Sequence, residues 1–341
     1  MTARTSRTSR RPGRTRLARA AVTTVALIGL AACANPVPEP TPDAAPAVPP
    51  PALTVAQSTS VLDQVGEVLA AGDAANDPAG LPARLSGPAL AIRTAEYVRA
   101  VATNGERPVV QLPMTAQTTI VPDTDTWPRT QMVVTEQPAD LQAPLLLVLQ
   151  QAGPREPYRL WSWARLGPSV QMPATAEPEI GSEPVAPDDA SLLMPPTEAL
   201  AQYADVLTNG DASGAAATFP PDFFRTALTA ARDQTAASLQ AVATVGETVA
   251  PVDGAVTALR TADGGAIVVG QLSTVTTVTL SQGSITLNDP FDAALAGKTS
   301  VTSNLVRTWT DVVALYVPPA GGAQQVTVLA AEHARTAVTG E

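Results

Sequence analysis

The residue types best suited to holding a ligand are concentrated in one short run near the middle of the chain, which contains two of the four tryptophans. The run alternates basic and aromatic residues, in the order Arg159, Trp161, Trp163 and Arg165. On a strand these side chains share one face, because successive side chains point to opposite faces. Two guanidinium groups beside two indoles can stack, pair with carboxylates or hold an anionic ring. We predict a binding patch here, which Trp127 and Arg129 could extend.

An alternative explanation for the same run is structural. The two indoles could fill the core beneath the helices, or the seam between two domains, with the arginines at the rim. The sequence does not decide between the two explanations.

The single histidine, His333, is the other obvious candidate for chemistry. One histidine cannot form a histidine-rich metal site, and a triad would need a hydroxyl group and an acid beside it. The adjacent acid, Glu332, would point to the opposite face of an expected strand, so it cannot orient the imidazole. The sequence contains no phosphate-binding loop, dinucleotide fingerprint or zinc spacing. We therefore predict no enzymatic activity, no cofactor and no metal site.

Two pairs of acidic residues could hold a cation or a proton. Asp73 and Asp211 each follow a glycine that is expected to end a helix, and a calcium site would need several more oxygens from the same loop. Asp123 and Asp125 lie in an expected loop, whereas a catalytic carboxyl needs an apolar pocket to tune its pKa. We interpret the first pair as turn-stabilising residues and the second as solvated acids.

The N-terminus has the pattern of an export signal. An arginine-rich segment is followed by the apolar stretch Ala20–Leu30, which is too short to span a membrane as a mature helix. The stretch ends in Leu30-Ala31-Ala32-Cys33. This sequence resembles the lipobox of bacterial lipoproteins. The resemblance implies cleavage before Cys33, attachment of diacylglycerol to its thiol, and a place on the extracytoplasmic face of the cell membrane. The general secretory and the twin-arginine export routes both remain open.

The chain beyond the signal is rich in proline at its start and acidic throughout. Half of the residues from 36 to 51 are proline, which predicts an extended tether. Cys33 is the only cysteine, so no disulfide is expected. The formal net charge is −10 for the whole chain, and the first 32 residues contain seven of the 21 basic residues and no acid, which leaves 14 basic against 31 acidic residues in the remainder. Such an acidic body makes nucleic acid an unsuitable partner.

An internal repeat organises the rest of the chain. Residues 62–74 and 200–212 are identical at seven of thirteen positions, with the shared pattern L-x-Q-x-x-[DE]-V-L-x-x-G-D. The same offset of 138 pairs Leu81-Pro82 with Phe219-Pro220 without a gap. The repeat predicts two copies of one fold.

Each copy begins with residues of helical periodicity and continues with segments rich in Val, Thr and Ile. Apolar stripes predict helices around 62–72, 90–103, 200–209 and 222–239, with Gly72 and Gly210 at the C-caps of the first and third. Strands are expected at 109–120, 130–135, 145–150 and 158–166 in the first copy. In the second copy they are expected at 256–261, 266–280, 284–287, 312–317 and 325–331, with hairpin turns at 262–265, at Gln282-Gly283 and after Val317.

Helices followed by an antiparallel meander predict an α+β fold. The order of elements resembles the nuclear-transport-factor-two-like (cystatin-like) superfamily, and the whole chain resembles tandem-domain lipoproteins of actinobacteria. The resemblance implies, in each copy, a helical hairpin packed on a curved antiparallel sheet. The expected divisions are a signal peptide (1–32), a tether (33–52), a first domain (53–173), an acidic proline-rich linker (174–196) and a second domain (197–341).

Three functions remain open at this stage. The first is a non-catalytic binding module of the cell envelope, with an envelope protein or polymer as its partner. The second is a carrier or sensor of a hydrophobic small molecule, which would need a large, closed, dry pocket. The third is an isomerase or hydrolase of the cystatin-like superfamily, which a buried carboxyl with a raised pKa would favour.

Overall fold

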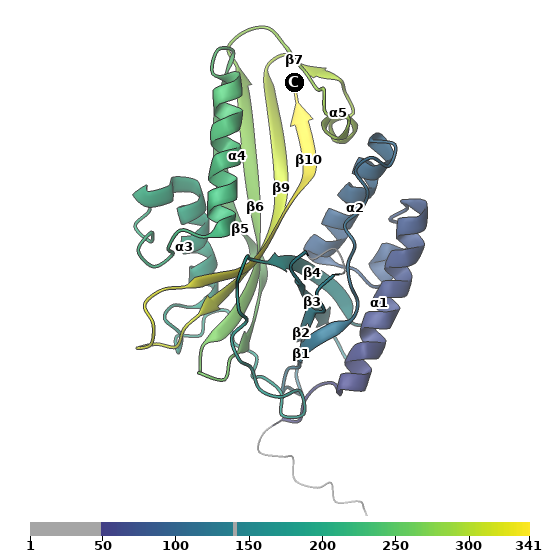
Figure 1. Ribbon diagram of the computed structural model, residues 1–341, viewed down its shortest axis with the longest axis vertical. Coiled ribbons are helices and arrows are strands. Elements are labelled where there is room, and N and C mark those ends of the chain that lie inside the picture. Colours follow the sequence, from purple (N-terminus) through teal and green to yellow (C-terminus); the bar gives the residue numbers. More distant parts are fainter. Residues whose placement is uncertain (1–48, 139–141) are drawn as a thin grey trace, which may run out of the picture. The chain divides into compact units, whose positions relative to one another are not determined.

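An eight-stranded antiparallel sheet forms the framework of the computed structural model, which describes residues 49–138 and 142–341 (Figure 1). The leader, Cys33 and most of the tether therefore lie outside the described residues. The strand order is β1 (Ala116–Ile120), β2 (Arg129–Thr135), β3 (Leu145–Gln151), β4 (Arg159–Leu166), β10 (Thr327–Gly340), β9 (Asn304–Val317), β6 (Ala266–Leu280) and β5 (Ala243–Arg260).

The sheet is strongly curled. β4 and β10 join its two halves through the pairs Leu166–Ala330 and Arg165–Ala331. Near the opposite ends of the strand order, Thr257 of β5 donates a hydrogen bond to Thr130 of β2, with 3.0 Å between the two hydroxyl oxygens. Strands that are far apart in the sheet therefore face each other across the curl.

Five α-helices of the described residues pack against this sheet (Figure 1). They are α1 (Val55–Ala75), α2 (Gly87–Ala102), α3 (Pro196–Asn209), α4 (Phe223–Leu239) and α5 (Pro290–Ala296). α1 begins at a capping box, in which Thr54 and Gln57 each bond the other's backbone amide. A short pair, β7 (Ile285–Thr286) and β8 (Ser300–Val301), lies on either side of α5 in the chain. The predicted α+β class, with helices on a curved antiparallel sheet, is confirmed at this level.

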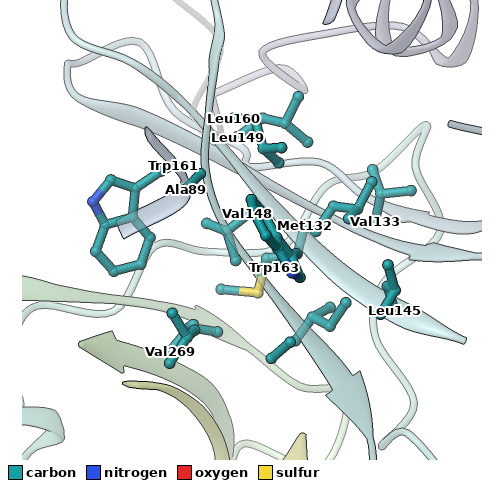
Figure 2. Packing of buried hydrophobic residues seen from close by; sticks show 14 of the residues in the cluster. Ala89, Met132, Val133, Leu145, Val148, Leu149, Leu160, Trp161, Trp163 and Val269 are labelled. Atoms are coloured by element: carbon teal, nitrogen blue, oxygen red, sulfur yellow. The ribbon is translucent and has the colours of Figure 1, made fainter. Parts of the chain in front are cut away.

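The largest core cluster joins both halves of the chain. It contains α1, α2 and the buried strands β2, β3 and β4, together with residues of β6 and β9 such as Val269 and Val312 (Figure 2). A second cluster lies under α3 and α4 on β6 and β9, and a third surrounds Leu305 near the start of β9. The described residues accordingly form one compact unit, and the two expected domains share one sheet.

Several predicted elements match the structure and others are longer. The strands expected at 130–135, 145–150, 158–166 and 266–280 are found within a residue at either end. β5, β9 and β10 extend well beyond the expected segments, because Gly, Pro and charged residues within them read as loop. The hairpin expected at Gln282-Gly283 was wrong, since Ile285 pairs with Val301 of β8 and not with β6.

The segment expected to be a linker lies between β4 and α3. It packs on the sheet: the Val185 backbone amide donates to the carbonyl of Ala258 in β5, and the Ser182 amide donates to the carbonyl of Val121. The segment thus bonds to both halves.

Gly72 does not cap α1, as its sequence position suggested. The helix continues to Ala75 and ends at Asn76, whose backbone is left-handed. A Cβ atom at Gly72 would lie 2.5 Å from the hydroxyl oxygen of Tyr97. The glycine is needed for the close approach of α1 and α2.

We expect Gly72→Ala to lower the free energy of unfolding by about 1–3 kcal/mol, because the added methyl group must displace Tyr97. Gly66→Ala in the same helix is the control, since its Cβ would meet only the side chain of Met114, at 3.2 Å. Urea denaturation of the full-length protein measures both. Equal stabilities for the two variants would contradict the packing role of Gly72.

Candidate functional site

An open groove of about 470 Å³ lies between α4 and one face of the long strands. Its walls combine the titratable and aromatic side chains that the sheet brings together. From α4 they include Leu228, Arg232, Thr235 and Leu239, and from the sheet Glu247, Thr276, Leu305, Arg307, Trp309, His333 and Arg335. A larger hollow, of about 750 Å³, lies beside β1, but Asp63 and Glu177 are the only titratable residues in its lining. The α4 groove is therefore the stronger candidate for chemistry.

The position of α4 over the groove follows from its first turn. Asp222 caps the helix by accepting from the backbone amides of Phe224 and Arg225. The hydroxyl of Tyr203 in α3 donates to both oxygens of the same carboxylate, each at 3.1 Å. α3 and the start of α4 are thus held together by one carboxylate.

His333 stands at one end of the groove and is oriented by an acid on the neighbouring strand. β9 and β10 pair Asp311 directly with His333, and Nδ1 of the imidazole lies 2.5 Å from Oδ1 of Asp311. Asp311 is completely buried, and its other oxygen accepts a hydrogen bond from Thr274 of β6 at 2.5 Å. The acid that orients His333 therefore comes from the adjacent strand, and its sequence neighbour Glu332 does not take this role.

This geometry fixes which nitrogen of the imidazole is available. A carboxylate only accepts hydrogen bonds, so Nδ1 is the donor and Nε2 of the neutral ring is an acceptor. The side chain of His333 is 26% exposed, and no group in the described residues hydrogen-bonds Nε2. Nε2 is also not a buried atom. The ring therefore offers one free acceptor.

Aromatic contacts hold the same ring in place. Trp309 stacks on His333 with 4.1 Å between ring centroids and 11° between planes. Phe224 of α4 meets the imidazole edge-on at 6.0 Å, and the guanidinium of Arg335 lies 5.2 Å from the Trp309 ring. Such packing restricts the imidazole to one orientation.

Two arginines of the groove are already paired with acids at α5. Arg307 pairs with Asp292 at 2.7 Å, and Arg335 pairs with both Asp292 and Asp289. Asp292 is buried, and Asp289 also pairs with Arg107 from the first half of the chain at 2.9 Å. In this ionic wall three arginines share two carboxylates.

The far end of the groove holds a carboxylate whose hydrogen bonding is incomplete. Glu247 of β5 is 7% exposed at its side chain, and its Oε2 accepts a hydrogen bond from Thr276 at 2.9 Å. Its Oε1 is buried and has no hydrogen-bond partner. The nearest positive group is Nη1 of Arg232 in α4, which is 3.9 Å from Oε1.

The run of basic and aromatic residues singled out in the sequence is elsewhere, in the core. Trp163 is 0% exposed, Trp161 is nearly buried, and Figure 2 shows their rings pointing to different parts of the cluster. Val148 pairs with Ser162 and Leu149 with Leu160, so Trp161 is the extra residue of a β-bulge. The bulge puts Arg159 and Trp163 on opposite faces, and the expectation of one shared face was wrong. The two indoles occupy the positions that the structural explanation assigned to them.

The arginines of that run and the expected extension have partners of their own. Arg159 pairs with Glu156 at 3.1 Å, and Arg165 donates to the carbonyl of Ala143. Arg129 lies over the exposed ring of Trp127, 4.1 Å from its centroid. None of these residues lines the α4 groove.

The four acidic residues considered from the sequence, Asp73, Asp211, Asp123 and Asp125, do not form a common site. Asp73 lies inside α1, where it pairs with Arg93 and accepts from the Tyr97 hydroxyl, so it does not stabilise a turn. Asp211 is exposed and pairs with Arg225. Asp125 is exposed, while burial raises the pKa of Asp123. In residues 49–138 and 142–341, no three His, Cys, Asp or Glu side chains are placed to hold a metal ion.

Glu332 lies on the opposite side of β10 from His333. Burial, followed by the neighbouring Glu96, raises its pKa to about 7 from an ordinary value of 4.5. The carboxylate therefore destabilises the fold as the pH rises from about 4.5 to 7, which amounts to about 3 kcal/mol. We expect Glu332→Gln to remove this decline.

The measurement for Glu332 is the free energy of unfolding at pH 5 and pH 8, in urea, for wild type and variant. Glu332→Gln should be the more stable protein at pH 8 and should differ little at pH 5. Glu179→Gln, at an exposed position, is the control. A constant difference between wild type and Glu332→Gln at the two pH values would contradict the raised pKa.

Comparison with known proteins adds one result. No curated protein and no solved structure matches the chain. None of the described helices is long and apolar enough to cross a membrane. A family match covers residues 49–340, which is nearly all of the described chain. The chain belongs to the family described as Domain of unknown function (DUF8094).

Proposed function

We propose that this protein is a lipid-anchored binding module of the cell envelope and that its ligand occupies the α4 groove. The observation that carries the proposal is a set of polar atoms in the groove without a hydrogen-bond partner among the described residues, namely Nε2 of His333, Oε1 of Glu247 and Nε of Arg335. Buried or half-buried polar groups normally have hydrogen-bond partners, so such atoms in a groove are suited to a ligand.

The rest of the groove supports recognition more than bond breaking. Arg307 and Arg335 are held by Asp292, and the imidazole is held by Asp311 and Trp309. Side chains fixed in this way lose little entropy when a ligand binds. In the described residues no hydroxyl group or thiol lies within hydrogen-bonding distance of Nε2, so His333 has no nucleophile to activate.

The anchor is proposed from the sequence. The Leu30–Cys33 lipobox, followed by a proline-rich tether, is typical of proteins held outside the membrane by a lipid. We expect Cys33→Ala to move the protein from the membrane fraction to the soluble extracytoplasmic fraction. Retention in the membrane fraction would contradict the lipid anchor. The groove is unaffected by either outcome.

We also propose that the two halves are copies of one ancestral fold of the nuclear-transport-factor-two-like type. The sequence repeat is one support. The second is the order of the sheet, in which four successive strands of each half run from an edge to the centre and the last strands, β4 and β10, pair with each other. α1 and α2 precede the first set of strands as α3 and α4 precede the second.

Native mass spectrometry tests the binding function. The full-length protein should be purified in detergent from the cells that naturally produce it, and the detergent should be removed inside the mass spectrometer. We expect an additional mass that is lost on denaturation. Thr235→Trp, which fills the groove from α4, should lose that mass, while Gln234→Trp, at an exposed position on the same helix, should keep it. Two results would contradict a ligand site in the groove. One is the same additional mass in both variants, and the other is no additional mass in the wild type or in either variant.

A second candidate function is proton transfer on a small molecule, and the Asp311–His333 pair favours it. An imidazole whose Nδ1 is held by a buried carboxylate presents Nε2 as a general base. The two candidates differ in turnover: a binding module returns its ligand unchanged, whereas an isomerase alters it. Mass and retention time of the released molecule, before and after incubation with fresh protein, separate them.

A further inference from the structure

The free oxygen of Glu247 restricts the ligand first. A carboxylate oxygen can only accept hydrogen bonds, and Oε1 is buried without a partner while Oε2 is held by Thr276. An acceptor left unsatisfied away from water is costly. A ligand at this end of the groove must therefore bring an N–H or O–H donor.

The other end of the groove offers a second acceptor, which is open to solvent. Nε2 of His333 is an acceptor because Nδ1 donates to Asp311. Glu247 of β5 pairs with Thr276 of β6, which in turn pairs with Arg307 of β9. His333 of β10 pairs with Asp311, which lies four residues further along β9 than Arg307. Four residues of strand span about 13 Å. A ligand that extends along the groove can thus place donors at two well-separated points, of which the one at Glu247 is required.

The charges around Glu247 disfavour the simplest donors. Nη1 of Arg232 lies 3.9 Å from Oε1 and donates to the carbonyls of Leu207 and Thr208, so a ligand group between α4 and β5 meets a free acceptor beside a guanidinium. An ammonium group or a carboxylate at this point would be attracted by one of the two side chains and repelled by the other, so a full charge of either sign gains little. A hydroxyl group both donates and accepts, and neighbouring hydroxyls can satisfy both side chains.

We infer that the ligand of the α4 groove is a neutral polyhydroxylated molecule, namely a saccharide. The inference rests on the proposed binding function and names its ligand class. Glu247 and Arg232 bind adjacent hydroxyls at one end, and Nε2 of His333 accepts from a hydroxyl at the other. Arg307 and Arg335 are each paired with acids at α5, which weakens the attraction of that wall for an anion.

The experiment titrates four probes into full-length protein that carries ¹⁵N-labelled tryptophan. The probes are maltotriose, trehalose, spermidine and citrate. The readout is the indole N–H signal of Trp309, which Trp309→Phe identifies among the four tryptophans. We expect a saturable shift with at least one of the two saccharides and none with spermidine or citrate.

Glu247→Gln tests the site within the same experiment. The change keeps the shape and the contact with Thr276 but replaces the free acceptor by an N–H donor, so saccharide affinity should fall tenfold or more. Thr276→Val, which removes the hydroxyl that orients Glu247, should weaken binding in the same direction. Glu179→Gln, an exposed acid outside the groove, should leave affinity unchanged. Circular dichroism confirms that each variant is folded.

The outcomes separate the ligand class from the function. Binding of spermidine or citrate alone would overturn the saccharide inference and leave a binding groove. Saccharide binding that Glu247→Gln does not weaken would overturn the assigned contacts. No response of Trp309 to any probe would contradict the saccharide inference, while the native mass of the purified protein still decides whether the groove binds a ligand.

Discussion

Trp163→Ala should lower the free energy of unfolding by about 3–5 kcal/mol, which is one of the two largest effects expected for a single substitution in this protein. The side chain is 0% exposed and lies in the core cluster that joins both halves of the chain. Removing it leaves a cavity that the surrounding strands cannot fill, because β3 and β4 are held by antiparallel pairing on both sides.

Urea denaturation, followed by far-ultraviolet circular dichroism of the full-length protein, measures this effect. Trp127→Ala is the matched control, since that indole is exposed, and it should change stability by less than about 0.5 kcal/mol. Trp163→Phe should be milder than Trp163→Ala, because the indole nitrogen has no hydrogen-bond partner to lose. If Trp163→Ala is as stable as Trp127→Ala, the indole is a surface group and a ligand role for that strand returns.

Arg93→Met should be comparably destabilising, by about 3–5 kcal/mol, because it removes a buried cation from two acids. Asp73 is then left without an ion-pair partner in the described chain, while Glu96 keeps only Arg99. Arg93 is 1% exposed and pairs with Asp73 at 2.8 Å and with Glu96 at 2.7 Å. It also donates to the carbonyl of Val110, so it ties α1, α2 and the segment before β1 together.

The control for Arg93 is Arg159→Met, which breaks a more exposed pair with Glu156 and should cost less than about 1 kcal/mol. The double variant Arg93→Met/Asp73→Asn should recover part of the loss, because the carboxylate that lost its ion-pair partner is neutralised as well. Both are measured by the same urea denaturation. A loss below about 1 kcal/mol for Arg93→Met would mean that the cluster is hydrated and not a buried link between the helices.

Local patterns in the sequence predicted most of the elements. The helices and the strands near 130–166 have unbroken apolar periodicity, and each of them is found in the structure. The strand bounds agree to within a residue, whereas α1 begins at Val55, well before the expected start near 62, and the strand expected at 109–120 begins only at Ala116.

β5 could not be read in full, because it contains Gly246, Pro251 and Asp253, which normally indicate loops. Gly246 and Pro251 pair with β6, and Asp253 lies in the irregular stretch between Pro251 and Val256. This pairing is invisible in a local window.

The sequence did not predict the α4 groove because the pairing of β9 with β10 shifts by one residue along the hairpin. Tyr316 pairs with Thr327 at the start of the β9–β10 hairpin, and continuing this register would set Asp311 opposite Glu332. A bulge between Val328 and Ala330 shifts the pairing by one residue and sets Asp311 opposite His333. The alternation of Trp309 with Asp311 was a usable signal, since it places both on the same face of a strand. The bulge itself has no such signal.

A second bulge explains the opposite error at the tryptophan run. The alternation of Arg159, Trp161, Trp163 and Arg165 is real in the sequence, but the extra residue in β4 divides it between two faces. Arg159 and Arg165 then serve different neighbours. In both strands the bulge shifts the pairing by one residue. A prediction from side-chain periodicity assumes that no such shift occurs.

The central claim is that Asp311 holds His333 with Nε2 facing the groove as a free acceptor. Because the chain has a single histidine, a long-range ¹H–¹⁵N spectrum of the full-length protein reports on this ring alone. At pH 8 the account predicts the tautomer that carries its proton on Nδ1, and a change of the Nε2 signal when the ligand binds. A ring protonated on Nε2, or an Nε2 signal that ligand binding leaves unchanged, would contradict it.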